Sequence, residues 1–332
     1  MSELVGAVLT RPSIEASRAT DVLARHWGID GVLRPLPSER DRNFAVTVDG
    51  TDRYVLKIAN SAEDPTFLAV QHRAMDRLAA AAVPCQRAVP TRGGTEVVDI
   101  GAAGAPSLAR LLTWLPGRPL ASIPPADRPA GLLRDLGRVM GRTVTALAGF
   151  DAPVAHRSFQ WSADDGFAVI DAHAAAVADP SRAALLAGWR TRLAPLADLL
   201  PTLRHGVIHN DANDHNVLVA DDGAAVSGLL DLGDMVWSPV VHELAVAAAY
   251  AALGSDDPTD VIEAVRAGFE ETFPLEDRER AAVPELVALR LATSVALSAH
   301  QSRLAPDDPY LTVSEGPAWA LLERLWTIEP GR

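Results

Sequence analysis

The chain carries the sequence His209-Asn210-Asp211-Ala212-Asn213-Asp214-His215-Asn216, and the apolar Val217-Leu218-Val219 follows it. Fifteen residues after Asn216 a second acidic group, Asp231-Leu232-Gly233-Asp234, stands directly behind two leucines. The pattern His-x-Asp-x-x-x-x-Asn followed by Asp-x-Gly is typical of phosphoryl transfer. One carboxylate accepts the proton of the attacking hydroxyl, while an amide and a second carboxylate hold magnesium. The sequence predicts Asp211 as the catalytic base, Asn216 and Asp231 as Mg2+ ligands, and Asp234 as a further metal contact.

A hairpin is expected to bring the two metal-binding groups together. Asp222-Gly223 is a turn signal, and the apolar run from Val226 to Leu230 returns antiparallel to the strand after Asn216. Asn216 and Asp231 then lie at neighbouring strand ends, where an amide oxygen and a carboxylate can share one hard cation.

Two details of this region indicate a small acceptor rather than a protein. Protein kinases place a lysine two residues after the catalytic aspartate, and this chain has Asn213 there. Pro239 follows Asp231 by eight residues, which leaves no room for the activation segment on which a peptide would lie. The predicted enzyme is therefore a small-molecule kinase.

One alternative is a metal-dependent hydrolase, in which the same loop would supply the ligands of two metal ions. Its ligands would be His209, Asp211, Asp214 and His215. The sequence disfavours this class, because no second cluster of histidine and aspartate follows; His242 and His300 are isolated within helical patterns. The simpler interpretation of His209 is a structural histidine that packs the loop.

The first third of the chain is predicted to be an antiparallel sheet with two helices. Alternating and apolar runs predict strands at 31–36, 44–48, 54–58, 95–100 and 107–114. Asp49-Gly50 is a hairpin turn signal between the second and third of these strands. Helical periodicity marks residues 13–27 and 64–78.

Candidate nucleotide-binding residues lie in this sheet-rich part. Lys57, inside the third strand, is predicted to grip the nucleotide phosphates. The loop before the second strand has no glycine, so Ser38 and Arg42 would replace the usual close backbone approach to phosphate. Gln71 stands where protein kinases place the glutamate that pairs with the strand lysine, and its amide would orient Lys57 by a hydrogen bond.

A hinge is expected where strand periodicity gives way to helical periodicity. The backbone of Leu112, Thr113 and Trp114 is predicted to contact the adenine edge. The predicted domains are a nucleotide-binding lobe at 1–112, a hinge at 113–117 and a catalytic and substrate-binding lobe at 118–332. Within the last, helices are expected at 127–150, 171–179 and 182–200. The predicted class is α+β.

Composition restricts the partners. The net charge of −13 and a pI near 5.1 argue against nucleic acid and anionic membranes, and favour a cationic small substrate. No apolar run approaches the ~20 residues that span a bilayer; the longest, 240–253, is interrupted by His242 and Glu243. A single cysteine, Cys85, indicates a cytoplasmic protein. The oligomeric state is left open.

Acidic residues of the second lobe are candidates for binding a substrate amine. They are Glu243, Glu270, Glu271, Asp307 and Asp308. For each of them alone, a solvated helix face is the simpler interpretation.

Together these motifs resemble the aminoglycoside phosphotransferase and choline kinase superfamily, over nearly the whole length of the chain. The stretch from Ile208 to Asn216 is most similar to the hydroxylysine kinase group and to the phosphotransferase modules fused to class III aminotransferases. Two departures from the family pattern are Asn210, for the glycine of His-Gly-Asp, and Gln71, for the glutamate that partners the lysine.

The resemblance implies a bilobal protein-kinase-like fold, with a small antiparallel sheet lobe and a larger, mainly helical lobe. It implies ATP, with GTP as the alternative, and Mg2+ as cofactors. The acceptor is expected to be a hydroxyl of an amine-bearing metabolite. The alternatives are an aminoglycoside or basic peptide antibiotic, and a homoserine-type substrate.

Overall fold

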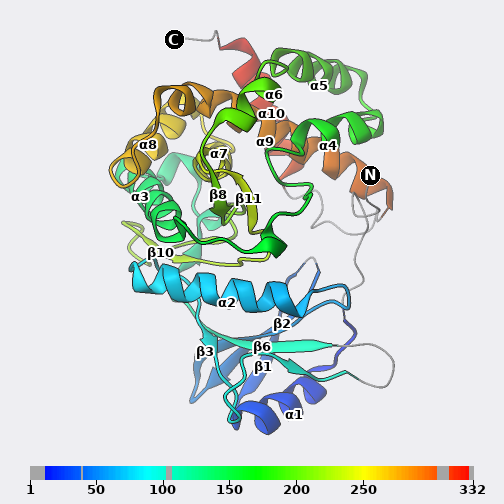
Figure 1. The fold of residues 1–332 in the computed structure, drawn as a ribbon, viewed down its shortest axis with the longest axis vertical. Helices are drawn as coiled ribbons and strands as arrows, with labels where there is room; N and C mark the ends of the chain where they lie inside the picture. Colours follow the sequence, from blue (N-terminus) through cyan, green and yellow to red (C-terminus); the bar gives the residue numbers. More distant parts are fainter. Residues whose placement is uncertain (1–11, 39, 102–106, 305–313, 329–332) are drawn as a thin grey trace. The chain divides into compact units, whose positions relative to one another are not determined.

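The computed structural model describes residues 12–38, 40–101, 107–304 and 314–328. Within them the chain forms two compact units (Figure 1). The smaller unit holds the described residues up to Ala80 together with Cys85–Pro116, and the larger holds Ala81–Pro84 and the described residues from Gly117 onward. Antiparallel sheets and many helices confirm the predicted α+β class.

The smaller unit is built on a six-stranded antiparallel sheet of order β1-β2-β3-β6-β4, with β5 paired to β6. Its strands are β1 (Val32–Leu36), β2 (Arg42–Val48), β3 (Thr51–Ile58), β4 (Ala88–Val89), β5 (Val98–Asp99) and β6 (Leu108–Thr113). Asp49 and Gly50 turn the chain between β2 and β3 with positive φ angles of 50° and 76°. Such a turn matches the twist of the two strands, so the predicted hairpin is confirmed.

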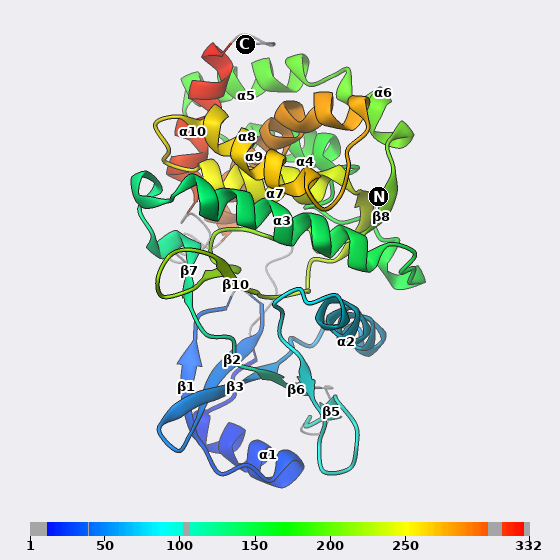
Figure 2. The same cartoon turned by 90° about the vertical axis from the view of Figure 1, so that its left-hand side faces the viewer.

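The two faces of this sheet differ in character. Helix α1 (Ala16–Trp27) packs on one face, against a cluster that includes Phe44, Leu56 and Ile58. Because side chains alternate along a strand, Lys57 lies on the other face. Helix α2 (Pro65–Ala80) covers that second face (Figures 1 and 2).

The larger unit is mainly helical, with two small sheets of order β10-β9-β7 and β11-β8. Its helices are α3 (Ala130–Leu147), α4 (Gly166–His173), α5 (Pro180–Arg192), α6 (Leu196–Leu199), α7 (Val241–Ala252), α8 (Pro258–Glu270), α9 (Asp277–Leu304) and α10 (Glu315–Thr327). Its strands are β7 (Arg118–Pro119), β8 (His205–Ile208), β9 (Val217–Val219), β10 (Val226–Leu229) and β11 (Val236–Pro239).

Two predicted helices differ from those observed. The helix expected at 171–179 begins earlier, as α4 from Gly166. The helix expected at 182–200 is divided into α5 and α6, because Pro195 has no amide hydrogen to continue α5. Strand β11, which pairs with β8, is not predicted by the sequence patterns; it is only four residues long.

Helix α7 is the centre of the larger unit, and all of its residues are buried. It lies among α3, α8 and α9 (Figure 2). The longest apolar stretch is not the predicted 240–253 but α9, the one helix of the described residues that is long and apolar enough to cross a membrane. Because 78% of its apolar window is buried inside the structure, α9 has the surroundings of a core helix.

Glycines let α3 and α8 cross at very short range. A Cβ added at Gly268 would lie 1.9 Å from the Arg134 carbonyl oxygen, and one added at Gly137 would lie 2.0 Å from the Val265 carbonyl oxygen. Backbone cannot yield as a flexible side chain can, so this crossing requires glycine.

Gly268→Ala is therefore expected to lower the free energy of unfolding by about 1–3 kcal/mol, the usual cost of overpacking. The matched control is Gly131→Ala in α3, where an added Cβ meets nothing within 4 Å. That control should be neutral or stabilising by about 0.5–1 kcal/mol. Urea unfolding of both variants measures the difference, and equal stabilities would contradict the packing argument.

Candidate active site

The loop after β8 is held by one buried carboxylate. Glu243 of α7 is 0% exposed, and its Oε2 accepts hydrogen bonds from the backbone amides of His209 (2.6 Å) and Asn210 (3.2 Å). Burial raises the pKa of Glu243, while the neighbouring His209 and these two amides act in the opposite direction. Asn210 has φ +67°, a left-handed conformation that asparagine tolerates better than most residues. The loop is thus fixed at Asn210, where its backbone adopts this left-handed conformation.

Both nitrogens of the His209 ring form hydrogen bonds with backbone atoms. Its Nε2 lies 2.9 Å from the Leu230 carbonyl oxygen and donates to it, so Nδ1 is the acceptor for the Asp211 amide at 3.2 Å. The side chain is completely buried. His209 is therefore structural, as predicted, and has no nitrogen left for a metal. The hydrolase alternative, which needs His209 as a metal ligand, therefore loses one of its four ligands.

Asp211 is held by two asparagine side chains. Its Oδ1 accepts from Asn213 Nδ2 at 2.8 Å, and its Oδ2 accepts from Asn216 Nδ2 at 2.6 Å. Burial and the nearby Asp234 raise the pKa of Asp211 well above its usual value, and Arg290 and Asn213 oppose this shift. Asn213, which stands at the lysine position of protein kinases, has a different task here: it orients the carboxylate.

The hairpin of β9 and β10 brings the predicted metal-binding positions together. Leu230 donates its amide to the Asn216 carbonyl oxygen at 2.8 Å, so Asp231 follows directly beside Asn216, as predicted. The Asn216 amide nitrogen donates to both the carbonyl and the carboxylate of Asp211. Its remaining donor atom toward a cation is Oδ1.

The turn after β10 carries the two further carboxylates. Asp231 has φ +58°, and its Oδ1 accepts from the Gly233 amide at 3.0 Å. Asp234 is 6% exposed, and its carbonyl oxygen accepts from Asn210 Nδ2 at 3.3 Å. Arg157 donates to the carbonyl oxygens of Gly233 (3.0 Å) and Met235 (3.2 Å). Arg157, which the sequence patterns do not reveal, thus anchors this turn.

These residues fit a magnesium ion. Asp231 follows directly beside Asn216, and the negative charges of Asp234 and Asp231 raise the pKa of Asp211. Such a concentration of negative charge favours a divalent cation, and carboxylate and amide oxygens are the donors that Mg2+ prefers. The residues fit Mg2+ because they offer oxygen donors and negative charge.

In the smaller unit, the polar partner of Gln71 is an arginine. Gln71 Oε1 accepts from Arg110 Nη1 at 2.7 Å, and both side chains are buried. Arg110 of β6 stands directly opposite Lys57 of β3 in the strand register, and Lys57 is 5% exposed. Gln71 thus has a hydrogen-bond partner in Arg110, a residue that sequence reasoning missed, and its predicted role in orienting Lys57 stays a prediction.

The predicted phosphate loop is tied down by side chains. Ser38 Oγ accepts from the Asp41 amide at 3.2 Å, and Asp41 Oδ1 accepts from the amide of Asn60 at 3.1 Å. The Arg42 guanidinium lies 5.0 Å from the centroid of the Phe44 ring. These contacts join Ser38 to Asp41, and Asp41 to the segment that follows β3.

The predicted hinge begins as a strand. Leu112 pairs with β3 on one side and with β4 on the other. Thr113 donates its amide to the Arg87 carbonyl oxygen, and its own carbonyl accepts from Gln86 Nε2 at 3.2 Å. Trp114 likewise donates its amide to the Arg53 carbonyl oxygen at 2.8 Å. The backbone contact of Leu112, Thr113 and Trp114 to the adenine edge stays a prediction.

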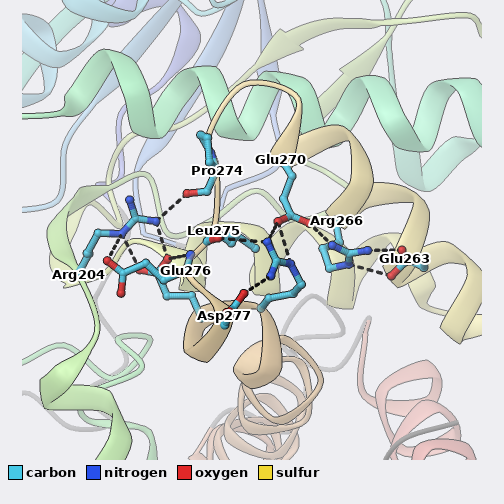
Figure 3. Close-up of polar contacts among 10 residues, drawn as sticks. Arg204, Glu263, Arg266, Glu270, Pro274, Leu275, Glu276 and Asp277 are labelled. Atoms are coloured by element: carbon cyan, nitrogen blue, oxygen red, sulfur yellow. Dashed lines mark hydrogen bonds and ion pairs between the residues drawn. The ribbon is translucent and has the colours of Figure 1, made fainter.

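The acidic candidates for amine binding are mostly engaged elsewhere. Glu243 is buried under the catalytic loop, as described above. Glu270 forms ion pairs with Arg266 and Arg280 (Figure 3), and Glu271 pairs with Arg138. Asp307 and Asp308 lie outside the described residues.

The geometry agrees with comparisons across known proteins. The model of the phosphotransferase enzyme family, which includes the aminoglycoside phosphotransferases, matches residues 32–284. The chain belongs to this family. It is also 31% identical to a hydroxylysine kinase of Danio rerio, over 96% of this chain and 93% of that protein. This phosphotransferase is an ATP-dependent small-molecule kinase, as the catalytic loop predicts.

Solved structures support the protein-kinase-like fold of this phosphotransferase. A microcompartment-associated aminopropanol kinase is similar with a TM-score of 0.71 and 17% identity, over 94% of this chain and 98% of that one. An amicoumacin kinase in complex with AMP-PNP, Ca2+ and Ami is similar with a TM-score of 0.70 and 16% identity, over 94% of both chains. At these identities the likeness concerns the fold alone.

Glu243→Ala is expected to destabilise the protein by about 2–4 kcal/mol, because two buried backbone amides lose their acceptor at ~1–3 kcal/mol each. Glu243→Gln retains an acceptor oxygen and should lose less than half as much. The control Glu263→Gln removes a surface ion pair with Arg266 and should change stability by less than about 1 kcal/mol. Urea unfolding compares the three; equal losses for Glu243→Ala and Glu243→Gln would refute the anchoring role.

Proposed function

We propose that this phosphotransferase transfers the γ-phosphoryl group of ATP to the hydroxyl of hydroxylysine or a closely related amino acid. The observation that carries this proposal is the 31% identity to the Danio rerio hydroxylysine kinase, which extends over 96% of this chain and 93% of that protein. A likeness spread over both units includes the helical unit, where the acceptor is expected to bind.

Asp211 is the proposed catalytic base. Its two oxygens are oriented by Asn213 and Asn216, so the carboxylate cannot rotate freely. In a loose transition state the acceptor hydroxyl loses its proton late, and the fixed carboxylate accepts that proton at one oxygen. Orientation of this kind contributes to rate because the reacting groups are held before the reaction begins.

Asn216 and Asp231 are the proposed ligands of Mg2+, and Asp234 is a further contact. When bound, the ion offsets charge on the transferring phosphates. The chain's own contribution is to hold these oxygen donors in place: the β9–β10 pairing positions Asn216, and the Gly233 amide fixes Asp231.

Lys57 is the proposed phosphate-binding residue of the smaller unit, with Ser38 and Arg42 at the neighbouring loop. Gln71 acts on the nucleotide indirectly, through Arg110, its hydrogen-bond partner opposite Lys57. The backbone of Leu112, Thr113 and Trp114 is the proposed contact to the adenine edge. ATP is proposed over GTP as the donor.

A cationic acceptor is consistent with the net charge of −13. The alternatives, an aminoglycoside or basic peptide antibiotic and a homoserine-type substrate, use the same transfer chemistry and differ only in the acceptor.

A cytoplasmic location, where ATP is abundant, is proposed along with this activity. The single cysteine, Cys85, is buried and forms no disulfide.

A panel of acceptors tests the proposal. ATP consumption should be fastest with hydroxylysine, with kcat/KM at least about tenfold above homoserine, aminopropanol and a set of aminoglycosides, since one well-placed polar contact is worth ~10-fold or more. Lysine, which lacks the hydroxyl, is the matched negative control, and GTP in place of ATP tests the donor. A preference for an aminoglycoside would overturn the hydroxylysine assignment.

Asp211→Asn should lower kcat by about 100- to 10,000-fold, the range typical of removing a general base. Nucleotide affinity, measured by titration calorimetry, should stay within about threefold, because Asp211 acts on the acceptor. Asp221→Asn, an exposed residue in the turn between β9 and β10, is the control and should retain full activity. Substantial turnover by Asp211→Asn would exclude Asp211 as the base.

A further inference from the structure

Arg290 of helix α9 is the least expected charged residue in the larger unit. It is 2% exposed, in a helix whose central residues are almost all buried. Burying a guanidinium is costly unless its charge and hydrogen bonds are matched. A buried arginine therefore needs a reason in its surroundings.

The guanidinium of Arg290 is held on several sides. Its Nη1 donates to the Trp161 carbonyl oxygen at 3.1 Å. Its central carbon lies 4.4 Å from the centroid of the Trp161 ring and 5.6 Å from that of the Tyr250 ring. Aromatic faces stabilise a cation and restrict its rotation. The side chain is thus a fixed charge.

That fixed charge points at the proposed base. Arg290 Nη2 lies 3.6 Å from Asp211 Oδ1, the oxygen that also accepts from Asn213. The other oxygen of Asp211 is bonded to Asn216. The two asparagines are neutral, so Arg290 brings the positive charge to this carboxylate. It opposes the effect of burial on the pKa of Asp211 and also on that of Glu243.

We propose that Arg290 is a positioning residue for catalysis: it holds the Asp211 carboxylate in the orientation in which it meets the acceptor hydroxyl. Protein kinases have a lysine two residues after the base, whereas here a cation reaches the base from a helix some eighty residues later in the chain. Because the Arg290 guanidinium is buried, it acts through Asp211 and not on the acceptor. This inference rests on the proposed role of Asp211.

The test compares Arg290→Met, which removes the charge, with Arg290→Lys, which keeps the charge but loses the planar fork. For Arg290→Met, kcat should fall about 100-fold, the effect of a small misplacement of a catalytic group. For Arg290→Lys it should fall about tenfold. The KM for the acceptor and the affinity for ATP should stay within about threefold in both variants.

The matched controls are Arg204→Met and Arg204→Lys. Arg204 pairs with the buried carboxylate of Glu279, in the first turn of α9, and donates to the Pro274 carbonyl oxygen (Figure 3). These controls should lose stability but keep kcat within about threefold per folded molecule, as judged by circular dichroism. If Arg290→Met does not fold, the kcat of Arg290→Lys is compared with that of Arg204→Lys, and this comparison tests the inference.

A kcat within threefold of wild type for folded Arg290→Lys and Arg290→Met would overturn the inference. A rise in acceptor KM with unchanged kcat would also overturn it, because that result indicates direct substrate binding. The wild-type enzyme in the same assay separates the two proposals: failure with every acceptor refutes the proposed function. In that case the rate of slow ATP hydrolysis without acceptor is measured instead, and this rate is compared between the Arg290 and Arg204 variants.

Discussion

The catalytic loop depends on the pair of hydrogen bonds from His209 and Asn210 to Glu243. Two consecutive amides donate to one carboxylate oxygen in the core. These hydrogen bonds fix the loop, at His209 and Asn210, to the central helix α7. The His209 ring then spans from the Asp211 amide to the carbonyl of Leu230, so the loop and the returning strand β10 are joined through one side chain. The proposed base and the proposed metal ligands all follow this anchor in the chain.

The larger unit stabilises a dense group of charges that would be unfavourable if each stood alone. Asp211, Asp231 and Asp234 interact electrostatically, and burial alone would tend to protonate the first of them. The chain offsets this with asparagine amides, a backbone amide and the buried Arg290. The carboxylate of the proposed base is thus held in a partly buried site by neutral amides and by a buried cation, which itself lies against aromatic rings.

The local parts of the site could be predicted from sequence, whereas its distant supports could not. The spacing from His209 to Asn216 and the turn at Asp222-Gly223 are short-range signals, and the β9–β10 hairpin follows them. Glu243 looks like an ordinary polar residue at a helix start, and Arg290 like one charge in a long helix; only the packing of α7 and α9 reveals their roles. Likewise Arg110 becomes the partner of Gln71 only through the pairing of β3 with β6.

The pairing of Gln71 with Arg110 has a consequence for regulation. Many protein kinases are switched on and off by making or breaking an ion pair between a glutamate on the helix beside the sheet and the strand lysine. Helix α2 has no glutamate, and its one acidic residue is the exposed Asp76. Gln71 is hydrogen-bonded to Arg110. That switch is absent from α2. An ion pair of that kind with Lys57 therefore cannot be formed by a glutamate of α2.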